Sequence, residues 1–186
     1  MPDRIKDCSL DNKEDSLISR LLAGEHSAAQ EFVDLYYRRI YLFMRRMGHS
    51  RQISEDLTQD CFLQAWNHLG QIRNAQALKG WIYRIAANIS NEYWRRNKKK
   101  IVSLNDIEPP DNLKFNNKES DSEFLEEISV LKDAVSQLPL KLRKTIVLHY
   151  MQHLTIAEAA EAIGIRQGTM KSRLNRALKA LRELLA

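Results

Sequence analysis

Residues 78–98 read LKGWIYRIAANISNEYWRRNK, and the spacing of the apolar residues in this stretch decides the fold class. Seven of them fall on one face of an α-helix, without a polar interruption: Leu78, Trp81, Ile82, Ile85, Ala86, Ile89 and Tyr93. We therefore predict a long helix that packs this face against a core. A second stripe at helical spacing carries only basic and amide side chains: Arg84, Asn88, Asn91, Arg95 and Lys98.

A third stripe of the same helix is predicted to lie on a face away from the core. It places two aromatic residues around two small ones: Tyr83, Ala87, Ser90 and Trp94. Aromatic rings beside cations suit single-stranded nucleic acid, because rings stack on bases and cations follow phosphates. The aromatics could equally pack against a neighbouring helix, and the basic residues after Trp94 could form a solvated helix end. The residues alone leave these alternatives open.

A second informative segment begins with Thr155-Ile156-Ala157-Glu158, which has the pattern of a helix capping box. The helix that it starts is predicted to end at Gly164, and an acid-free basic helix follows up to Arg182. A short capped helix, a glycine turn and a basic amphipathic helix together predict a DNA-binding helix-turn-helix. The alternative is an ordinary helical hairpin with a solvated basic face.

Composition and charge distribution predict two domains. The 186 residues include only 6 Gly and 4 Pro, which favours helices over an all-β fold. The net charge of +5 conceals two basic segments, 84–100 and 166–182, on either side of an acidic one, 103–128. We predict an all-α protein with two small helical domains, residues 14–100 and 124–186, joined by a flexible acidic linker at 101–123 after an N-terminal tail at 1–13.

Several function classes are not expected. The sequence has no run of about 18 apolar residues and no secretory signal, so we expect a cytoplasmic protein without direct membrane insertion. Cys8 and Cys61 match no disulfide or metal pattern. We find no phosphate-binding loop and no nucleophile–base pair, and therefore expect neither catalysis nor a cofactor. His149 and His153 share a helical face, but no glutamate motif accompanies them, so a zinc site is not favoured.

The helix predicted over residues 55–69 carries an acidic face. Ser54 is placed to cap it, and its first turn holds Glu55 and Asp56, which the helix dipole favours. Together with Gln59 and Asp60 these acids form an exposed polar face. By itself, such a face is most simply interpreted as solvated surface.

Three segments together resemble the extracytoplasmic-function (ECF) type of bacterial RNA polymerase sigma factor, of the sigma-70 family. Glu55–Trp66 is similar to the polymerase-binding helix of that family. Gly80–Asn88, with Tyr93–Arg96, is similar to the segment that melts the promoter and reads its minus-10 element. The third match is to the minus-35-reading helix-turn-helix: Leu138-Pro139, Thr155–Gly164 and Gly168–Leu174. The sequence departs from the family at Cys61, where a small aliphatic residue is more usual, and at Ala157–Ala160.

The resemblance implies three sets of functional residues. The core-docking set, for the β′ clamp of core RNA polymerase, is Glu55, Asp56, Gln59, Asp60 and Leu63. The strand-reading set, for the melted minus-10 strand, is Arg73, Asn74, Lys79, Tyr83, Arg84, Asn88, Asn91, Trp94, Arg95, Arg96 and Lys98. The duplex-reading set, for the minus-35 element, is Gln167, Thr169, Lys171, Ser172, Arg173, Asn175 and Arg176.

The resemblance also implies partners. These are core RNA polymerase, through its β′ clamp and β flap, promoter DNA as duplex and as single strand, and an anti-sigma factor. The competing hypothesis is a stand-alone helix-turn-helix regulator, which would bind a palindromic duplex tightly without polymerase.

Overall fold

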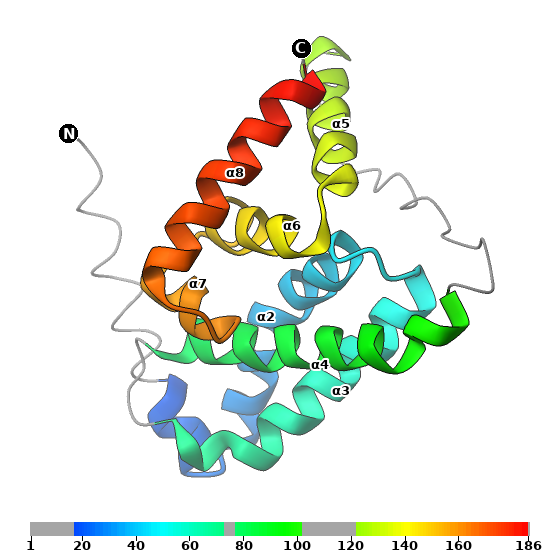
Figure 1. Ribbon diagram of the computed structural model, residues 1–186. Coiled ribbons are helices and arrows are strands. Elements are labelled where there is room, and N and C mark those ends of the chain that lie inside the picture. Colours follow the sequence, from blue (N-terminus) through cyan, green and yellow to red (C-terminus); the bar gives the residue numbers. More distant parts are fainter. Residues whose placement is uncertain (1–16, 73–76, 102–121, 186) are drawn as a thin grey trace.

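The computed structural model describes residues 17–72, 77–101 and 122–185, and within these ranges all regular structure is helical (Figure 1). This confirms the predicted all-α class. In chain order the elements are a short helix at 17–22, α2 (His26–Arg46), α3 (Arg51–His68), the 3-10 turn η1 (Leu69–Gln71), α4 (Leu78–Ile101), α5 (Ser122–Gln137), α6 (Leu140–Ile146), the π-helical segment η3 (Val147–Met151), α7 (Ile156–Ala162) and α8 (Gln167–Leu185).

The helices up to α4 form an N-terminal domain. The core side of α2 is a stripe of fully buried residues that packs against α3 and α4: Ala28, Phe32, Tyr36, Ile40, Phe43 and Met44. The predicted core face of α4 is confirmed, because six of its seven apolar residues are at most 8% exposed: Leu78, Trp81, Ile82, Ile85, Ala86 and Ile89. Gly24 and Gly48 have φ angles of 78° and 88°, and this left-handed backbone ends the helices that precede them.

The start of α3 differs from the prediction. Ser50 caps the helix, with its side chain accepting a hydrogen bond from the Ile53 backbone N–H at 3.4 Å. Ser54 is fully buried one turn later, where its hydroxyl donates to the His49 carbonyl at 3.3 Å. The predicted cap at Ser54 is therefore wrong by one helical turn, because the chain packs this serine against the end of α2 rather than leaving it at the helix entrance.

The helices from α5 onward form a C-terminal domain. In it, α8 packs against α5, α6 and α7, with Met170, Leu174, Ala177 and Leu181 as its buried side. The capping box predicted for α7 is present: the Thr155 hydroxyl accepts from the Glu158 N–H at 3.2 Å, and the Glu158 carboxylate accepts from the Thr155 N–H at 2.7 Å. This cap satisfies two backbone groups that would otherwise lack partners, and so fixes where α7 begins.

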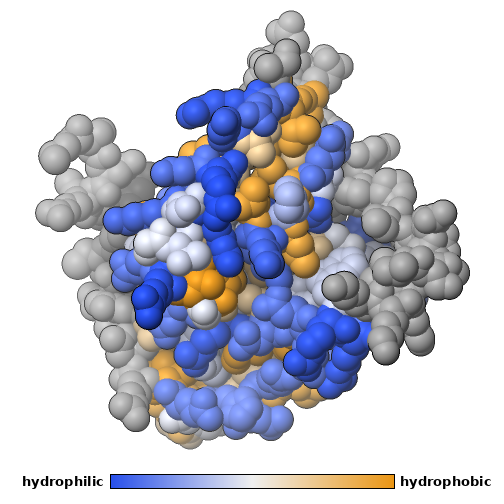
Figure 2. Space-filling model, in the orientation of Figure 1, coloured by the Kyte–Doolittle hydropathy of each residue, from blue (hydrophilic) through white to orange (hydrophobic). Residues whose placement is uncertain are grey.

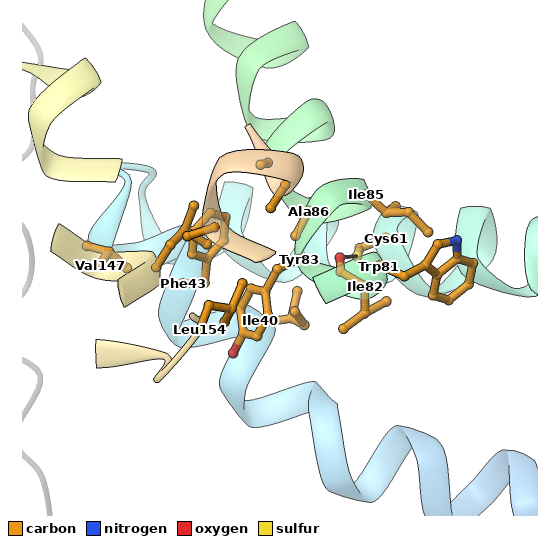
Figure 3. Close-up of a cluster of buried hydrophobic side chains, with 14 of the residues drawn as sticks. Ile40, Phe43, Cys61, Trp81, Ile82, Tyr83, Ile85, Ala86, Val147 and Leu154 are labelled. Atoms are coloured by element: carbon orange, nitrogen blue, oxygen red, sulfur yellow. Dashed lines mark hydrogen bonds between the residues drawn. The ribbon is translucent and has the colours of Figure 1, made fainter. Parts of the chain in front are cut away.

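The two domains pack directly against each other, with α7 lying along α4 while α5 and α8 extend away from the N-terminal helices (Figure 1). Their buried side chains form one cluster. Figure 3 shows Val147 and Leu154 of the C-terminal domain beside Phe43 and Tyr83 of the N-terminal domain. The linker predicted at 101–123 falls almost entirely outside the described residues. The packing of α7 on α4 thus determines which surfaces are accessible.

Candidate nucleic-acid interface and docking surfaces

The helix-turn-helix places the duplex-reading set on one open face of α8. Gly164, with φ of 66°, makes the turn, and the Ile165 N–H donates to the Ala160 carbonyl at 2.9 Å. Ala159, Ala160 and Ala162 are almost completely buried, so α7 and α8 can approach closely. Six members of the duplex-reading set are exposed, and the seventh, Arg173, is half-buried. Hydrophilic side chains follow α8 along the face seen in Figure 2.

The exposed face of α8 has the chemistry that DNA recognition needs. Its amide, hydroxyl and cationic groups include donors and acceptors for base edges in a major groove, whereas the buried side holds the helix in place. No acid lies on α8 before Glu183, whose carboxylate is 4.0 Å from the Lys179 ammonium at the far end of the helix. The N-terminal half of α8 is thus an uninterrupted basic and polar surface.

The core-docking set lies on an exposed side of α3. Asp56, Gln59 and Asp60 are exposed, and Glu55 is half-exposed with its carboxylate 3.2 Å from Arg51. Two large apolar side chains stand in solvent beside these acids: Leu63 is 65% exposed and Trp66 is 54% exposed. Apolar groups surrounded by charges are typical of protein–protein interfaces rather than of a solvated helix face.

Trp66 is a candidate docking residue that the sequence interpretation did not include. It lies three positions after Leu63, on the same helix, and is exposed although tryptophan is usually largely buried. Helical spacing could have identified Trp66 from the sequence, because it shares one face of the helix with Asp56, Asp60 and Leu63.

On α4 the polar stripe is accessible in part. Asn88, Asn91 and Arg95 are exposed and Arg84 is half-buried. Arg96 is also exposed, and both it and Arg95 make ion pairs with Glu92, Arg95 at 3.7 Å. Arg73 and Asn74 of the strand-reading set lie outside the described residues, as does the side chain of Lys98.

The aromatic stripe of α4 lies on a buried face, so the prediction that it faces away from the core is wrong. Tyr83, Ala87 and Ser90 are at most 1% exposed. The Tyr83 ring packs edge-on against Phe43 at 5.6 Å between centroids, and its hydroxyl donates to the side-chain carbonyl of Gln152. Burial raises the pKa of Tyr83 well above its ordinary value. This face of α4 is buried because Phe43 and His49 of the N-terminal domain pack on it, and Gln152 of the C-terminal domain covers it at Tyr83.

Trp94, the other aromatic of that stripe, stacks on a buried histidine. Its ring centroid is 5.0 Å from that of His49, with an interplanar angle of 23°. The His49 Nε2 lies 2.8 Å from the Ser90 hydroxyl, while its Nδ1 and the Trp94 Nε1 are buried without a hydrogen-bond partner. Burial, and secondly the charge of Lys144, lowers the pKa of His49 to about 4. The histidine is therefore neutral at pH 7 and acts as a packing group.

His149 and His153 do not share a helical face as predicted, because η3 ends at Met151 and His153 has a left-handed backbone with φ of 54°. The Nδ1 of His149 lies 2.7 Å from the Leu154 carbonyl. Within 17–72, 77–101 and 122–185, no group of three histidine, cysteine, aspartate or glutamate side chains is placed to hold a metal ion. The same ranges contain no helix that is both long enough and apolar enough to cross a membrane.

Family models match both domains. The model described as Sigma-70 region 2 matches residues 32–100, and the one described as Sigma-70, region 4 matches residues 128–181. The ECF RNA polymerase sigma factor SigW of Bacillus subtilis is 27% identical over 176 residues, covering 90% of this chain and 94% of the relative. SigM of the same organism, also an ECF RNA polymerase sigma factor, is 29% identical and covers 83% and 93%.

Two solved structures share the fold. The sigma factor RpoE of Bartonella quintana, in complex with the anti-sigma factor NepR, superposes with a TM-score of 0.69 at 23% identity, covering 84% of this chain and 95% of that one. CnrH, in complex with the cytosolic domain of CnrY, gives a TM-score of 0.67 at 20% identity and covers 92% and 96%.

Proposed function

The chain belongs to the ECF group of the sigma-70 family of RNA polymerase sigma factors, and we propose that it binds core polymerase and directs promoter-specific initiation of transcription. The C-terminal domain reads the minus-35 duplex, the N-terminal domain reads the melted minus-10 strand, and RNA synthesis stays with polymerase. The observation that carries this proposal is the open, acid-free face of α8 on a tightly capped helix-turn-helix.

Within the duplex, α8 enters the major groove with its N-terminal half. Lys171 and Arg176 are suited to guanine, which offers two acceptors there, and Gln167 and Asn175 are suited to adenine. Arg173 is half-buried beside the domain core, so its guanidinium is better placed for a phosphate than for a base edge. Lys179 lies further along α8 and serves as a second phosphate contact.

Core polymerase binds through α3. The exposed Leu63 and Trp66 supply apolar area, and Asp56 and Asp60 next to them supply the charge that selects a basic partner. We propose that this surface binds the β′ clamp of core polymerase and that the C-terminal domain binds the β flap. An anti-sigma factor is the further partner, in keeping with the complex of RpoE with the anti-sigma factor NepR.

Transcription by core polymerase on a random-promoter library tests the proposal as a whole. We expect products only when this chain is present, from promoters that share a minus-35 and a minus-10 element. Tight binding of a palindromic duplex without polymerase, and no transcription with it, would instead indicate a stand-alone regulator.

Charge reversal on α3 tests the docking surface. Asp56→Lys with Asp60→Lys is expected to weaken core binding about tenfold or more, because each introduced lysine repels the basic partner surface that the aspartate attracted. Asp34→Lys, an exposed acid on α2, is the matched control and should bind core normally. Capture of core by the double variant at the wild-type level would refute the docking assignment.

Two lysines of α8 distinguish base reading from phosphate binding. Lys171→Ala should cost about 1–3 kcal/mol at one base pair and relax the preference there. Lys179→Ala should weaken binding to all duplexes about equally and lower the salt dependence. Unchanged sequence preference in Lys171→Ala, measured on a panel of single-base-pair variants, would remove Lys171 from the duplex-reading set.

A further inference from the structure

Three positively charged side chains meet where the end of α2 lies close to α4 and α6. Arg45 is 4% exposed, Lys144 is 8% exposed, and Arg143 is half-buried. We propose that these side chains form a binding site for a small oxyanion, inorganic phosphate or sulfate, whose charge balances theirs. None of the three belongs to the core-docking, strand-reading or duplex-reading set, so the site goes beyond the proposed function and does not depend on it.

The two arginines approach each other at the turn that follows α2. The Arg45 guanidinium donates to the His49 carbonyl at 2.8 Å. A Cβ placed on Gly48 would lie 3.1 Å from a guanidinium nitrogen of Arg143 and 3.7 Å from the Trp94 ring. Because Gly48 bears no side chain and has a φ of 88°, the arginine of α6 can lie directly against this turn.

Lys144 brings a third positive charge to the same histidine. Its ammonium donates to the side-chain oxygen of Asn91, and after burial its charge is the second cause that lowers the pKa of His49. Burial first, and then the charge of Arg173 on α8, lowers the pKa of Lys144 itself to about 8. Both shifts have the direction expected where positive charge is concentrated in a poorly hydrated place.

Within the described residues, no carboxylate neutralises these three cations. The ion pairs found there all involve other lysines and arginines. The acceptors around Arg45, Arg143 and Lys144 are neutral: backbone carbonyls for the two arginines and an amide oxygen for the lysine. A buried charge is costly unless an opposite charge accompanies it, because the group has given up its hydration shell. The cluster therefore favours an anion.

Three buried nitrogen atoms beside the cations add hydrogen-bonding capacity. Among the residues that the structure describes, the Arg143 Nε, the Trp94 Nε1 and the His49 Nδ1 have no partner. The first two carry N–H donors, and the third does so when the other ring nitrogen, 2.8 Å from the Ser90 hydroxyl, is the acceptor. Buried donors nearly always have a partner. An oxyanion offers several charged oxygen acceptors and thus meets both the charge and the hydrogen-bonding requirement.

Burial selects a small free ion over a phosphate in a nucleic-acid backbone. Arg45 and Lys144 are almost completely buried, so a phosphate that carries a sugar on either side cannot reach them. The half-buried Arg143 leaves a path for a compact ion. Guanidinium groups match the planar edge of two oxygens that phosphate and sulfate present, which explains a preference for these ions over chloride.

Thermal unfolding of the full chain tests the site with inorganic phosphate as the probe. At neutral pH and constant ionic strength, we expect about 10 mM phosphate to raise the Tm by about 4 °C or more relative to chloride. Lys144→Met should reduce this rise to about 1 °C or less. Arg182→Gln removes an exposed charge near the end of α8 and is the matched control, with the wild-type rise. No rise in the wild type, or an equal rise in Lys144→Met, would overturn the proposal.

The titration of His49 gives a second measurement that needs no variant at the site. Sulfate is the probe here, because it keeps both charges in acid. A sulfate ion beside Arg45 and Lys144 offsets their charge, so His49 should bind a proton about tenfold more tightly in sulfate than in chloride. NMR of the ring protons, assigned with His49→Gln, follows the titration, and the exposed His26 is the internal control. Equal titration of His49 in the two salts would contradict the site.

Discussion

Lowering the pH is expected to destabilise the protein through one buried histidine, His49. It is 3% exposed, stacks on Trp94, and approaches the Ser90 hydroxyl with one ring nitrogen while the other has no partner. A proton on this ring would be buried beside the Lys144 ammonium. Burial first, and then the charge of Lys144, lowers its pKa from the ordinary 6.5 to about 4.

The sign and size of the effect follow from that shift. In the unfolded chain His49 takes up a proton near pH 6.5, whereas in the folded chain it stays neutral down to about pH 4. Between these values the unfolded state binds more protons, so the free energy of unfolding falls as the pH is lowered from 6.5 towards 4. The stabilising contribution of neutral His49 is fully present above pH 6.5. Between pH 7 and pH 5 the loss amounts to about 2 kcal/mol.

Urea unfolding of wild type and His49→Gln at several pH values measures this contribution. Glutamine can still reach the Ser90 hydroxyl but does not titrate, and the carboxylates common to both proteins cancel in the difference. The wild type should lose about 2 kcal/mol more than the variant between pH 7 and pH 5. Parallel stability curves for the two proteins would show that His49 titrates normally and would refute the packing argument.

Two further predictions concern local structure. Thr155→Ala should lower the free energy of unfolding of the C-terminal domain by about 1 kcal/mol, because it removes the capping box of α7, whereas Ser172→Ala on the exposed face of α8 should leave it nearly unchanged. Urea unfolding compares the two, and equal stability would contradict the cap. Burial raises the pKa of the Cys61 thiol, so in Cys8→Ser protein this thiol should be alkylated by iodoacetamide only in denaturant; rapid labelling in native buffer, measured by mass spectrometry, would contradict its burial.

Features determined by neighbouring residues in the chain could be predicted from the sequence. The core face of α4 follows from helical periodicity, and the capping box at Thr155 needs only residues three positions apart. The aromatic stripe was predicted incorrectly because Tyr83 is buried by residues distant in the sequence: Phe43, 40 positions earlier on α2, and Gln152, 69 positions later in the C-terminal domain. No local pattern in α4 carries that information.

Which of two nearby residues of the same type caps a helix could not be predicted from the sequence either. Ser50 and Ser54 are both good helix caps, and packing against His49 decides that the first is the cap and the second is buried. Similarly, the acidic face of α3 was evident from its residues, but the exposure of Trp66 was not, because tryptophan at helical spacing normally indicates a core position.

The contact between the domains is intramolecular, and the chain length that joins them sets how strong it has to be. Only 20 residues separate Ile101 at the end of α4 from Ser122 at the start of α5. A linker of this length holds two domains at an effective concentration of the order of millimolar. An interface with a dissociation constant of about 0.1 mM between separate domains would then be closed about nine-tenths of the time. For an interface of that strength, separating the two domains would cost about 1.4 kcal/mol, a small fraction of the binding free energy of a nanomolar complex.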